Sequence, residues 1–425
     1  MPMLHLYSWG LSRGPRVRRN RTPRTSQVFR PHVEGLEQRL LLTINEFPVS
    51  FGSHPIGIAN GPDGNIWFTE QDLDRIGVMG TDGSLLAEYP VRTSNSRPEF
   101  IVAGPDGNMW FTEQRAGKIG RISTDGAVRE FALAPDSNPT FITAGPDGNL
   151  WFTEYSANRI GRISVDGAVW EFEIPTPNSH PMGITVGPDD NIWFTEFTGN
   201  KIGNLTPDGS ITEYDIGRAN SQPIGIATGW DGNLWFAEFR YPASKIGRMA
   251  TDGSGFVDYD VPGATSDVET ILAGPDGNMW YADSGGNKLG SVAQDGSILE
   301  YATPTSGSGP LGLTLGPDQT DIWFAEIDSN MIGQYVFDGG PARGGEHGGL
   351  GGGKGTHFHL PADSTIAPVP SILESAAPDR PIRADQPQAL SSGNLETTPP
   401  SHLLRRNPDM DWTLSPTADG PLGLI

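Results

Sequence analysis

The chain has 425 residues, no cysteine and a net charge of −22, with 51 acidic residues against 29 lysines and arginines. The absence of cysteine excludes a fold that depends on disulfide bonds, and no apolar run is long enough for a transmembrane helix. The acidic balance disfavours nucleic acid and anionic membranes as partners of the main body and favours cations or basic partners.

The first segment, residues 1–42, differs from the rest because it is basic. Residues 1–43 carry eight arginines and only two acidic residues, Glu34 and Glu37. This composition predicts a disordered or linker-like segment that serves export or processing. Binding of nucleic acid by this segment is the alternative. A standard secretory signal is missing, since Arg18 and Arg19 are not followed by a continuous apolar stretch.

Seven versions of the motif Gly-Pro-Asp-Gly-Asn-x-Trp-Phe-Thr-Glu follow one another at spacings of 41 to 45 residues. A period near 42 residues with short strands and turns is typical of a β-propeller with one blade per repeat. The sequence therefore predicts an all-β, seven-bladed β-propeller of four-stranded blades. The repeats are marked by Trp67, Trp110, Trp151, Trp193, Trp235, Trp280 and Trp323.

The first repeat shows how one blade is built. Residues 55–59 are small and apolar, which suits an innermost strand, and residues 61–65 have the composition of a tight turn. Residues 66–70 are β-branched and aromatic and predict a second strand. We expect a third strand over 75–79, an Asp-Gly hairpin turn at 82–83 and an outer fourth strand over 85–89.

The two ends of the array are out of phase, and this predicts how the ring closes. The last repeat stops at Asp338 and Gly339, before a fourth strand, whereas a strand without a blade, residues 44–49, precedes the first repeat. We expect this N-terminal strand to complete blade seven, which pairs the edges that an open array would expose. The domain then covers residues 43–339, and we expect a monomeric propeller.

The C-terminal segment, residues 340–425, opens with a glycine-rich stretch over 344–355 and continues rich in proline, serine and alanine. Without apolar periodicity, it predicts a disordered tail. His357 and His359 form a His-x-His pair there, for which a solvated, flexible state is the alternative to a weak metal site.

The acid that ends each repeated motif is a candidate for binding. Because the first two strands of a blade are antiparallel, we expect these acids near the start of the inner strands, in a ring at one mouth of the central channel. Such a ring could attract a cation, a small molecule or a basic protein ligand. The alternative is structural, with each acid accepting hydrogen bonds from its neighbours. The ring consists of Glu70, Glu113, Glu154, Glu196, Glu238, Asp283 and Glu326.

Residues that break the sevenfold repetition are further candidates, because a site usually breaks symmetry. The Pro-x-Gly that opens most blades becomes Pro98-Glu99-Phe100 in blade two and Pro139-Thr140-Phe141 in blade three, and blade six has Val268-Glu269-Thr270. Glu269 with Asp283 is the best carboxylate pair for a metal or for acid–base chemistry. Weaker catalytic candidates are His54 and His180, which precede prolines; a solvated loop histidine is the alternative for each. Blade five carries an insertion, Arg240-Tyr241-Pro242.

Over residues 44–338 the repeats resemble the virginiamycin B lyase (streptogramin B lyase) family. The motif ending in Leu150-Trp151-Phe152-Thr153-Glu154, the run from Asn158 to Ile163 and Ile174-Pro175-Thr176-Pro177 carry this resemblance. The resemblance implies elimination at the ester of a cyclic depsipeptide antibiotic, with Mg²⁺ held by glutamates and a histidine as general base. Residues 29–42 are also similar to an N-terminal motif of large exported proteins of environmental bacteria, which implies an extracellular or cell-surface location.

The catalytic part of the family pattern is missing from the matching positions. Where the resemblance places histidines after the inner-strand proline, this chain has Ile224, Glu269 and Leu311, and a metal-binding glutamate is replaced by Gly309. The other metal-binding glutamate corresponds at best to Glu326, so the metal candidates are Glu326 and Asp283. Elimination needs a base with a near-neutral pKa, which Leu311 does not supply.

Three hypotheses for the function follow. The first is an extracytoplasmic binding or interaction scaffold without the family's catalytic histidine and with no certain cofactor. The second is a Mg²⁺-dependent carbon–oxygen lyase that linearises streptogramin B antibiotics. The third, by analogy of fold alone, is a metal-dependent lactonase-like hydrolase.

Overall fold

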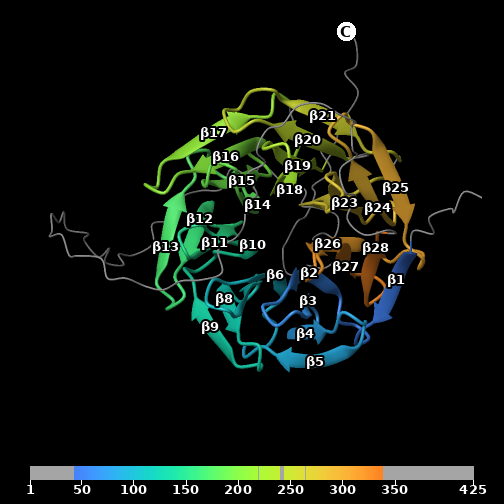
Figure 1. Cartoon of the computed structure of the whole chain (residues 1–425). Helices are drawn as coiled ribbons and strands as arrows, with labels where there is room; N and C mark the ends of the chain where they lie inside the picture. The colour runs from blue at the N-terminus through green and yellow to red at the C-terminus, as the bar shows by residue number, and fades with distance from the viewer. Residues whose placement is uncertain (1–42, 219, 240–243, 264, 338–425) are drawn as a thin grey trace, which may run out of the picture. The chain divides into compact units, whose positions relative to one another are not determined.

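A computed structural model describes residues 43–337, apart from residues 219, 240–243 and 264. In this part of the chain, 28 strands form seven antiparallel sheets of four strands each, arranged as blades around a centre (Figure 1). The predicted all-β, seven-bladed propeller is therefore confirmed. The predicted segments 1–42 and 340–425, the insertion at 240–242, His357 and His359 lie outside the described residues.

Each blade orders its strands from the centre outward. The inner strands are β2 (Pro55–Asn60), β6 (Pro98–Ala103), β10 (Pro139–Ala144), β14 (Pro181–Val186), β18 (Pro223–Thr228), β22 (Val268–Ala273) and β26 (Pro310–Leu315). The second strands are β3 (Ile66–Glu70), β7 (Met109–Glu113), β11 (Leu150–Glu154), β15 (Ile192–Glu196), β19 (Leu234–Glu238), β23 (Met279–Asp283) and β27 (Asp321–Glu326). The third strands are β4 (Arg75–Met79), β8 (Lys118–Ile122), β12 (Arg159–Ile163), β16 (Lys201–Leu205), β20 (Lys245–Met249), β24 (Lys288–Val292) and β28 (Met331–Val336). The outer strands are β5 (Leu85–Pro90), β9 (Val128–Ala132), β13 (Val169–Glu173), β17 (Ile211–Asp215), β21 (Val257–Asp260), β25 (Ile298–Ala302) and β1 (Thr43–Pro48). We number the blades 1 to 7 by their inner strands in chain order.

The N-terminal strand closes the ring, as the phase of the repeats predicts. β1 pairs antiparallel with β28, with Ile44 opposite Tyr335 and Phe47 opposite Ile332, and it is the outer strand of blade 7 (Figure 1). The Phe47 ring also stacks on Trp323, with 5.6 Å between ring centroids. Strand pairing and apolar burial therefore both join the two ends of the array.

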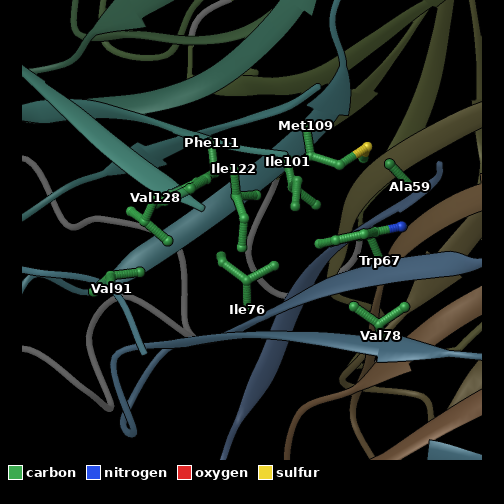
Figure 2. Packing of buried hydrophobic residues seen from close by; sticks show 10 residues of the cluster. All are labelled: Ala59, Trp67, Ile76, Val78, Val91, Ile101, Met109, Phe111, Ile122 and Val128. Atoms are coloured by element: carbon green, nitrogen blue, oxygen red, sulfur yellow. The ribbon is translucent and has the colours of Figure 1, made fainter. Parts of the chain in front are cut away.

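The apolar core lies between neighbouring blades. In the cluster of Figure 2, Trp67 and Ile76 of blade 1 pack with Ile101, Met109 and Ile122 of blade 2. Blades that share apolar faces in this way depend on both neighbours, so the hydrophobic effect stabilises the ring as a unit.

The repeated motif links a turn to a buried tryptophan. In blades 1 to 6 the indole N–H donates to the aspartate four residues earlier, as in Trp67 to Asp63 Oδ1 at 2.9 Å. Trp323 uses Asp321 instead, also at 2.9 Å. A buried indole N–H needs an acceptor, which explains why the Pro-Asp-Gly-Asn turn and the tryptophan occur together.

Threonines of the second strands connect blades 1 to 4 to the next blade. Thr153 Oγ1 accepts from Phe141 N at 3.2 Å and donates to Met182 O of blade 4 at 2.7 Å. Thr69, Thr112 and Thr195 donate in the same way, at 2.6 to 2.7 Å, to Glu99 O, Thr140 O and Ile224 O. Ala237, Ala282 and Ala325 occupy this position in blades 5 to 7.

Candidate functional site

The seven acids predicted to form a ring are buried inside their blades. Glu70, the last residue of β3, is fully buried, and so are its counterparts, with Asp283 at 1% exposure. The carboxyl group of each lies near an acid of the outer strand of the same blade. These pairs are Glu70 with Glu88, Glu113 with Glu130, Glu154 with Glu171, Glu196 with Glu213, Glu238 with Asp258, Asp283 with Glu300 and Glu326 with Glu46.

In six of the blades a basic residue of the third strand neutralises the outer acid. Lys201 is typical, since its Nζ lies 2.9 Å from Glu213 Oε2 and 2.8 Å from Thr176 Oγ1. The other five are Arg75, Lys118, Arg159, Lys245 and Lys288. In blade 7 the equivalent position holds Met331, and Glu46 accepts from Thr305, through N at 2.8 Å and Oγ1 at 2.6 Å.

Burial and the negative charge of the nearby outer acid both raise the pKa of the inner acids. Burial raises the pKa of Glu70, Glu113 and Glu196 from 4.5 to about 8, and that of Glu154, Glu238 and Glu326 to about 7. Burial likewise raises the pKa of Asp283. The geometry thus pairs each acid locally within its own blade, and a role of the ring in binding a shared cation stays a prediction.

The side chains that differ most between blades gather at one face, where the inner strands begin. We call it the proline face and define it by three positions per blade. The position before the inner strand holds His54, Arg97, Asn138, His180, Gln222, Asp267 and Gly309. The second residue of the inner strand is Ile56, Glu99, Thr140, Met182, Ile224, Glu269 or Leu311. The residue after the buried acid is Gln71, Gln114, Tyr155, Phe197, Phe239, Ser284 or Ile327.

The third of these positions was missed in the sequence analysis. Its backbone N–H donates to the carbonyl oxygen of the first position in all seven blades, at 3.0 to 3.3 Å, which holds the two residues side by side. The sequence does mark this position, because the residue directly follows a repeated acid and yet its type varies between blades. Sequence periodicity alone does not show that they contact the inner-strand positions.

Two apolar clusters occupy much of the proline face. Tyr155, Met182, Phe197 and Ile224 form one cluster across blades 3 to 5. A second cluster, of Ile56, Leu311 and Ile327, joins blades 7 and 1. Apolar side chains at these positions are buried against the neighbouring blade rather than presented as ligands for a metal.

Phe100 and Phe141 connect these clusters at the central channel. Their rings stack with 3.7 Å between centroids, and each packs against one of the clusters. They stand where blades 1, 4, 5 and 7 have the glycine of Pro-x-Gly, and with inner-strand residues such as Ile58 and Ile226 they line a central cavity of about 160 Å³. Replacing two glycines by phenylalanine therefore narrows the channel on one side.

A polar network lies at blades 1 and 2. Arg97 donates through Nη2 to Gln71 Oε1 at 2.9 Å, and Gln71 Nε2 donates to Glu99 Oε1 at 3.3 Å. All three side chains are at most 5% exposed. The symmetry-breaking residues Arg97 and Glu99 thus form part of one buried hydrogen-bonded chain.

The two candidate histidines lie in different surroundings. His180 is half-buried, stacks on Tyr155 at 4.6 Å between ring centroids, and has Nδ1 2.7 Å from Thr198 Oγ1. Burial lowers the pKa of His180, which favours the neutral imidazole. The His54 side chain is 32% exposed, and its Nδ1 contacts the carboxylate of Asp72.

Glu269 and Asp283 are not paired directly across β22 and β23. β22 is irregular between Val268 and Thr270, and it is Val268 that pairs with Asp283. Asp283 Oδ1 accepts from the backbone N–H of Asp267 at 2.7 Å and of Gly286 at 2.8 Å. Glu269 is 2% exposed on the proline face. Within the described residues, no three histidines or acids are grouped so as to hold a metal ion.

The positions at which the family resemblance implies a Mg²⁺ site do not fit that ion. Gly309 has no side chain, Leu311 is buried in an apolar cluster, and Glu326 hydrogen-bonds Ser329 at 2.9 Å beside Glu46. A hard divalent cation requires several oxygen ligands around one point, and these residues do not supply them.

Comparison with known proteins agrees with this architecture. Residues 42–333 match the model of the virginiamycin B lyase family. The chain belongs to the virginiamycin B lyase family. It is 36% identical to the virginiamycin B lyase of Staphylococcus aureus, whose solved structure has a TM-score of 0.66, with 70% of this chain and 99% of that chain covered.

Two further solved structures share 36% identity with this chain. A streptogramin B lyase structure has a TM-score of 0.65 and covers 69% of this chain and 97% of its own. A catalytically inactive histidine-to-alanine variant of the S. aureus enzyme with quinupristin has a TM-score of 0.65, with coverage of 70% and 99%. No curated protein sequence matches this chain. Among the described residues, none belongs to a helix with the length and apolar character needed to span a bilayer.

Proposed function

We propose that this chain is a ligand-binding member of the virginiamycin B lyase family that lacks the family's elimination chemistry. The observation that carries the proposal is the replacement of the expected base and metal ligand by Leu311 and Gly309, with Leu311 packed against Ile56 and Ile327. Elimination at an ester requires a proton acceptor beside the reacting carbon, and loss of a general base typically lowers the rate by 10²–10⁴-fold.

The proline face supports a binding role. No two blades carry the same three residues there, whereas the tryptophans, turns and acid pairs of the scaffold repeat, and recognition of an asymmetric ligand requires such differences. The ligand is a small molecule, a cation or a protein. The resemblance of residues 29–42 to an export motif supports an extracellular or cell-surface location in a bacterium.

A lyase with a relocated base is the second candidate, because Glu269 is a buried carboxyl group on the proline face at one of the positions where the family resemblance implies a histidine. In that case Glu269 would act as the proton acceptor, and its geometry would differ from that of the family.

The test is incubation of the purified chain with a streptogramin B antibiotic, with and without Mg²⁺, followed by mass spectrometry and chromatography of the linear product. We expect no turnover and no Mg²⁺-dependent rise in melting temperature. Turnover that disappears in Glu269→Gln or Glu326→Gln would overturn the proposal in favour of a lyase. Thr314→Ala, which changes an inner-strand residue outside the proline face, is the matched control.

A further inference from the structure

Five of the seven loops that lead into the inner strands share a side-chain clamp, and in blade 5 Ser244 stands at the clamping position and bonds Ser266. An aspartate or asparagine directly before the third strand, with φ between +50° and +59°, accepts hydrogen bonds from a serine in the loop that enters the next blade. Asn158, for example, accepts from Ser179 N at 2.6 Å and from Ser179 Oγ at 2.9 Å. The same clamp is formed by Asp74 with Ser96, Asn200 with Ser221, Asn287 with Ser308 and Asn330 with Ser53.

The loop that leads from blade 2 into blade 3 keeps its conformation but lacks this clamp. Gly117 occupies the aspartate or asparagine position and keeps its conformation, with φ +60°. The loop conformation is also kept, since Asp136 and Asn138 have φ of 63° and 51°, against 54° and 51° for Asn178 and His180. Ser137 is fully buried, and its Oγ has no hydrogen-bond partner. The hydroxyl that other blades satisfy internally is therefore left without an acceptor here.

A pocket of about 570 Å³ lies where the clamp is missing, between blades 2 and 3. Gly117 and Ser137 line it, and a Cβ atom at Gly117 would stand 3.4 Å from Ser137 Oγ. A second difference between the loops, at Ala134, also shapes this pocket. Ala134 lies five residues before the inner-strand proline, where Thr93, Thr176 and Thr305 in other loops bind the outer acid of the next blade. With Leu133 and Pro135, Ala134 gives the pocket an apolar wall.

The hydrogen bonds of Asp74 in blade 1 show which chemical group fits the space beside Gly117. One of its carboxylate oxygens accepts from Ser96 N at 2.8 Å, from Ser96 Oγ at 3.3 Å and from Arg97 N at 3.1 Å. An aspartate side chain beyond its Cα atom is equivalent to acetate, so the loop conformation is suited to a carboxylate. Arg115 also lines the pocket, with Nη1 2.9 Å from Asn95 Oδ1, and adds a positive charge.

We propose that this pocket binds a small molecule bearing a carboxylate, whose oxygen takes the place of the side chain missing at Gly117 and accepts from Ser137 Oγ. The apolar part of the ligand lies against Leu133 and Ala134, and the Arg115 guanidinium supports the carboxylate. The volume is within the range of small-molecule sites. The pocket is separate from the central cavity, but Gln114 and Asn138 of the proline face line it, so the proposal rests on the binding role of that face and adds a ligand class to it.

The test uses sodium butyrate as the probe, with sodium chloride at equal ionic strength and neutral butyramide as references. We expect butyrate to raise the melting temperature of the unaltered chain more than either reference does, and calorimetric titration to give a saturable isotherm. Ser137→Ala is expected to weaken binding by about tenfold, because it removes one hydrogen bond to a charged group. Ser179→Ala, which removes the matching hydroxyl from a clamped loop, is expected to leave butyrate binding unchanged.

Gly117→Asn provides the second variant. Asparagine tolerates the left-handed conformation at this position, as Asn158 and Asn200 do, so the variant is expected to restore the clamp, to melt at a higher temperature and to lose the response to butyrate. A butyrate response equal to that of chloride, or one that persists in Gly117→Asn, would overturn the proposal. So would equal losses of binding in Ser137→Ala and Ser179→Ala.

Discussion

At the scale of single residues, the buried acid pairs of blades 1 to 6 each set two carboxyl groups against one basic side chain. Glu154 lies beside Glu171, whose Oε2 is 2.7 Å from Arg159 Nη1. The cation neutralises the outer acid, and burial favours the protonated form of the inner one. The pair is therefore most stable when the inner acid is protonated, so the stability of the folded protein depends on pH.

We predict that the protein loses stability as pH rises through neutrality. Burial raises the pKa of Glu154 from 4.5 to about 7, so the folded state retains a proton that the unfolded state has lost. The stabilisation is present in full below about pH 4.5 and disappears as pH rises through about 7. Glu154→Gln is expected to raise the melting temperature at pH 8 but not at pH 5. Thermal melts of both proteins from pH 5 to 9 test this, and parallel pH profiles would contradict it.

Blade 7 lacks the cation of this arrangement, and we predict that Met331→Lys supplies it. Met331 Sδ is 4.0 Å from Thr305 Oγ1, the hydroxyl equivalent to the one that Lys201 contacts in blade 4. A lysine there would meet Glu46 and stabilise the fold by about 1 kcal/mol. Urea denaturation at pH 8 measures the change. Met331→Leu is the control, since it keeps the volume without the charge and should leave the midpoint nearly unchanged.

At the scale of elements, the second strand is the connection between blades. It carries the buried tryptophan on one side, and in blades 1 to 4 its threonine bonds the inner strand of the next blade. Alanine replaces the threonine in blades 5 to 7; in blade 6 Thr270 of the inner strand donates to Leu311 O instead, so blades 5 and 7 show that the ring closes without this bond. The threonines therefore add to stability rather than define the fold.

We predict that Thr153→Ala costs about 1–2 kcal/mol, because Phe141 N loses an acceptor and Met182 O loses a donor. Thr153→Ser keeps the hydroxyl and should retain most of the stability. Chemical denaturation of the two variants separates the hydrogen bond from the lost methyl group. Equal midpoints for both variants would assign the cost to packing instead.

At the scale of the whole molecule, the ring is closed by a strand from the far end of the chain. Ile44 and Phe47 of β1 pack in blade 7 against residues that lie more than 270 positions later, such as Trp323 and Tyr335. Bringing together residues that are so far apart in the sequence lowers the entropy of the chain. Pairing of β1 with β28 offsets this loss, because it removes two exposed strand edges.

We predict that deletion of residues 1–42 leaves the melting temperature nearly unchanged, whereas deletion of residues 1–50 lowers stability by several kcal/mol. The longer deletion removes the whole ladder between β1 and β28 and the apolar contacts of Phe47. Calorimetry of both truncated chains is the measurement. Equal melting temperatures would show that β1 does not hold the ring closed.

The number of blades, the four-strand order and the closing strand could be predicted from the sequence, because the motif repeats and the strand signals are local. The surroundings of Glu70 and its counterparts could not. The sequence places these acids at the ends of strands, but the pairing of the second, third and outer strands within each blade brings the inner acid beside the outer one. The same holds for the pocket at Gly117. A single glycine is unremarkable in the sequence, and only the packing of blade 3 against blade 2 leaves Ser137 buried without an acceptor. Periodicity is a property of neighbours along the chain, whereas burial and charge pairing arise between residues that the fold brings together.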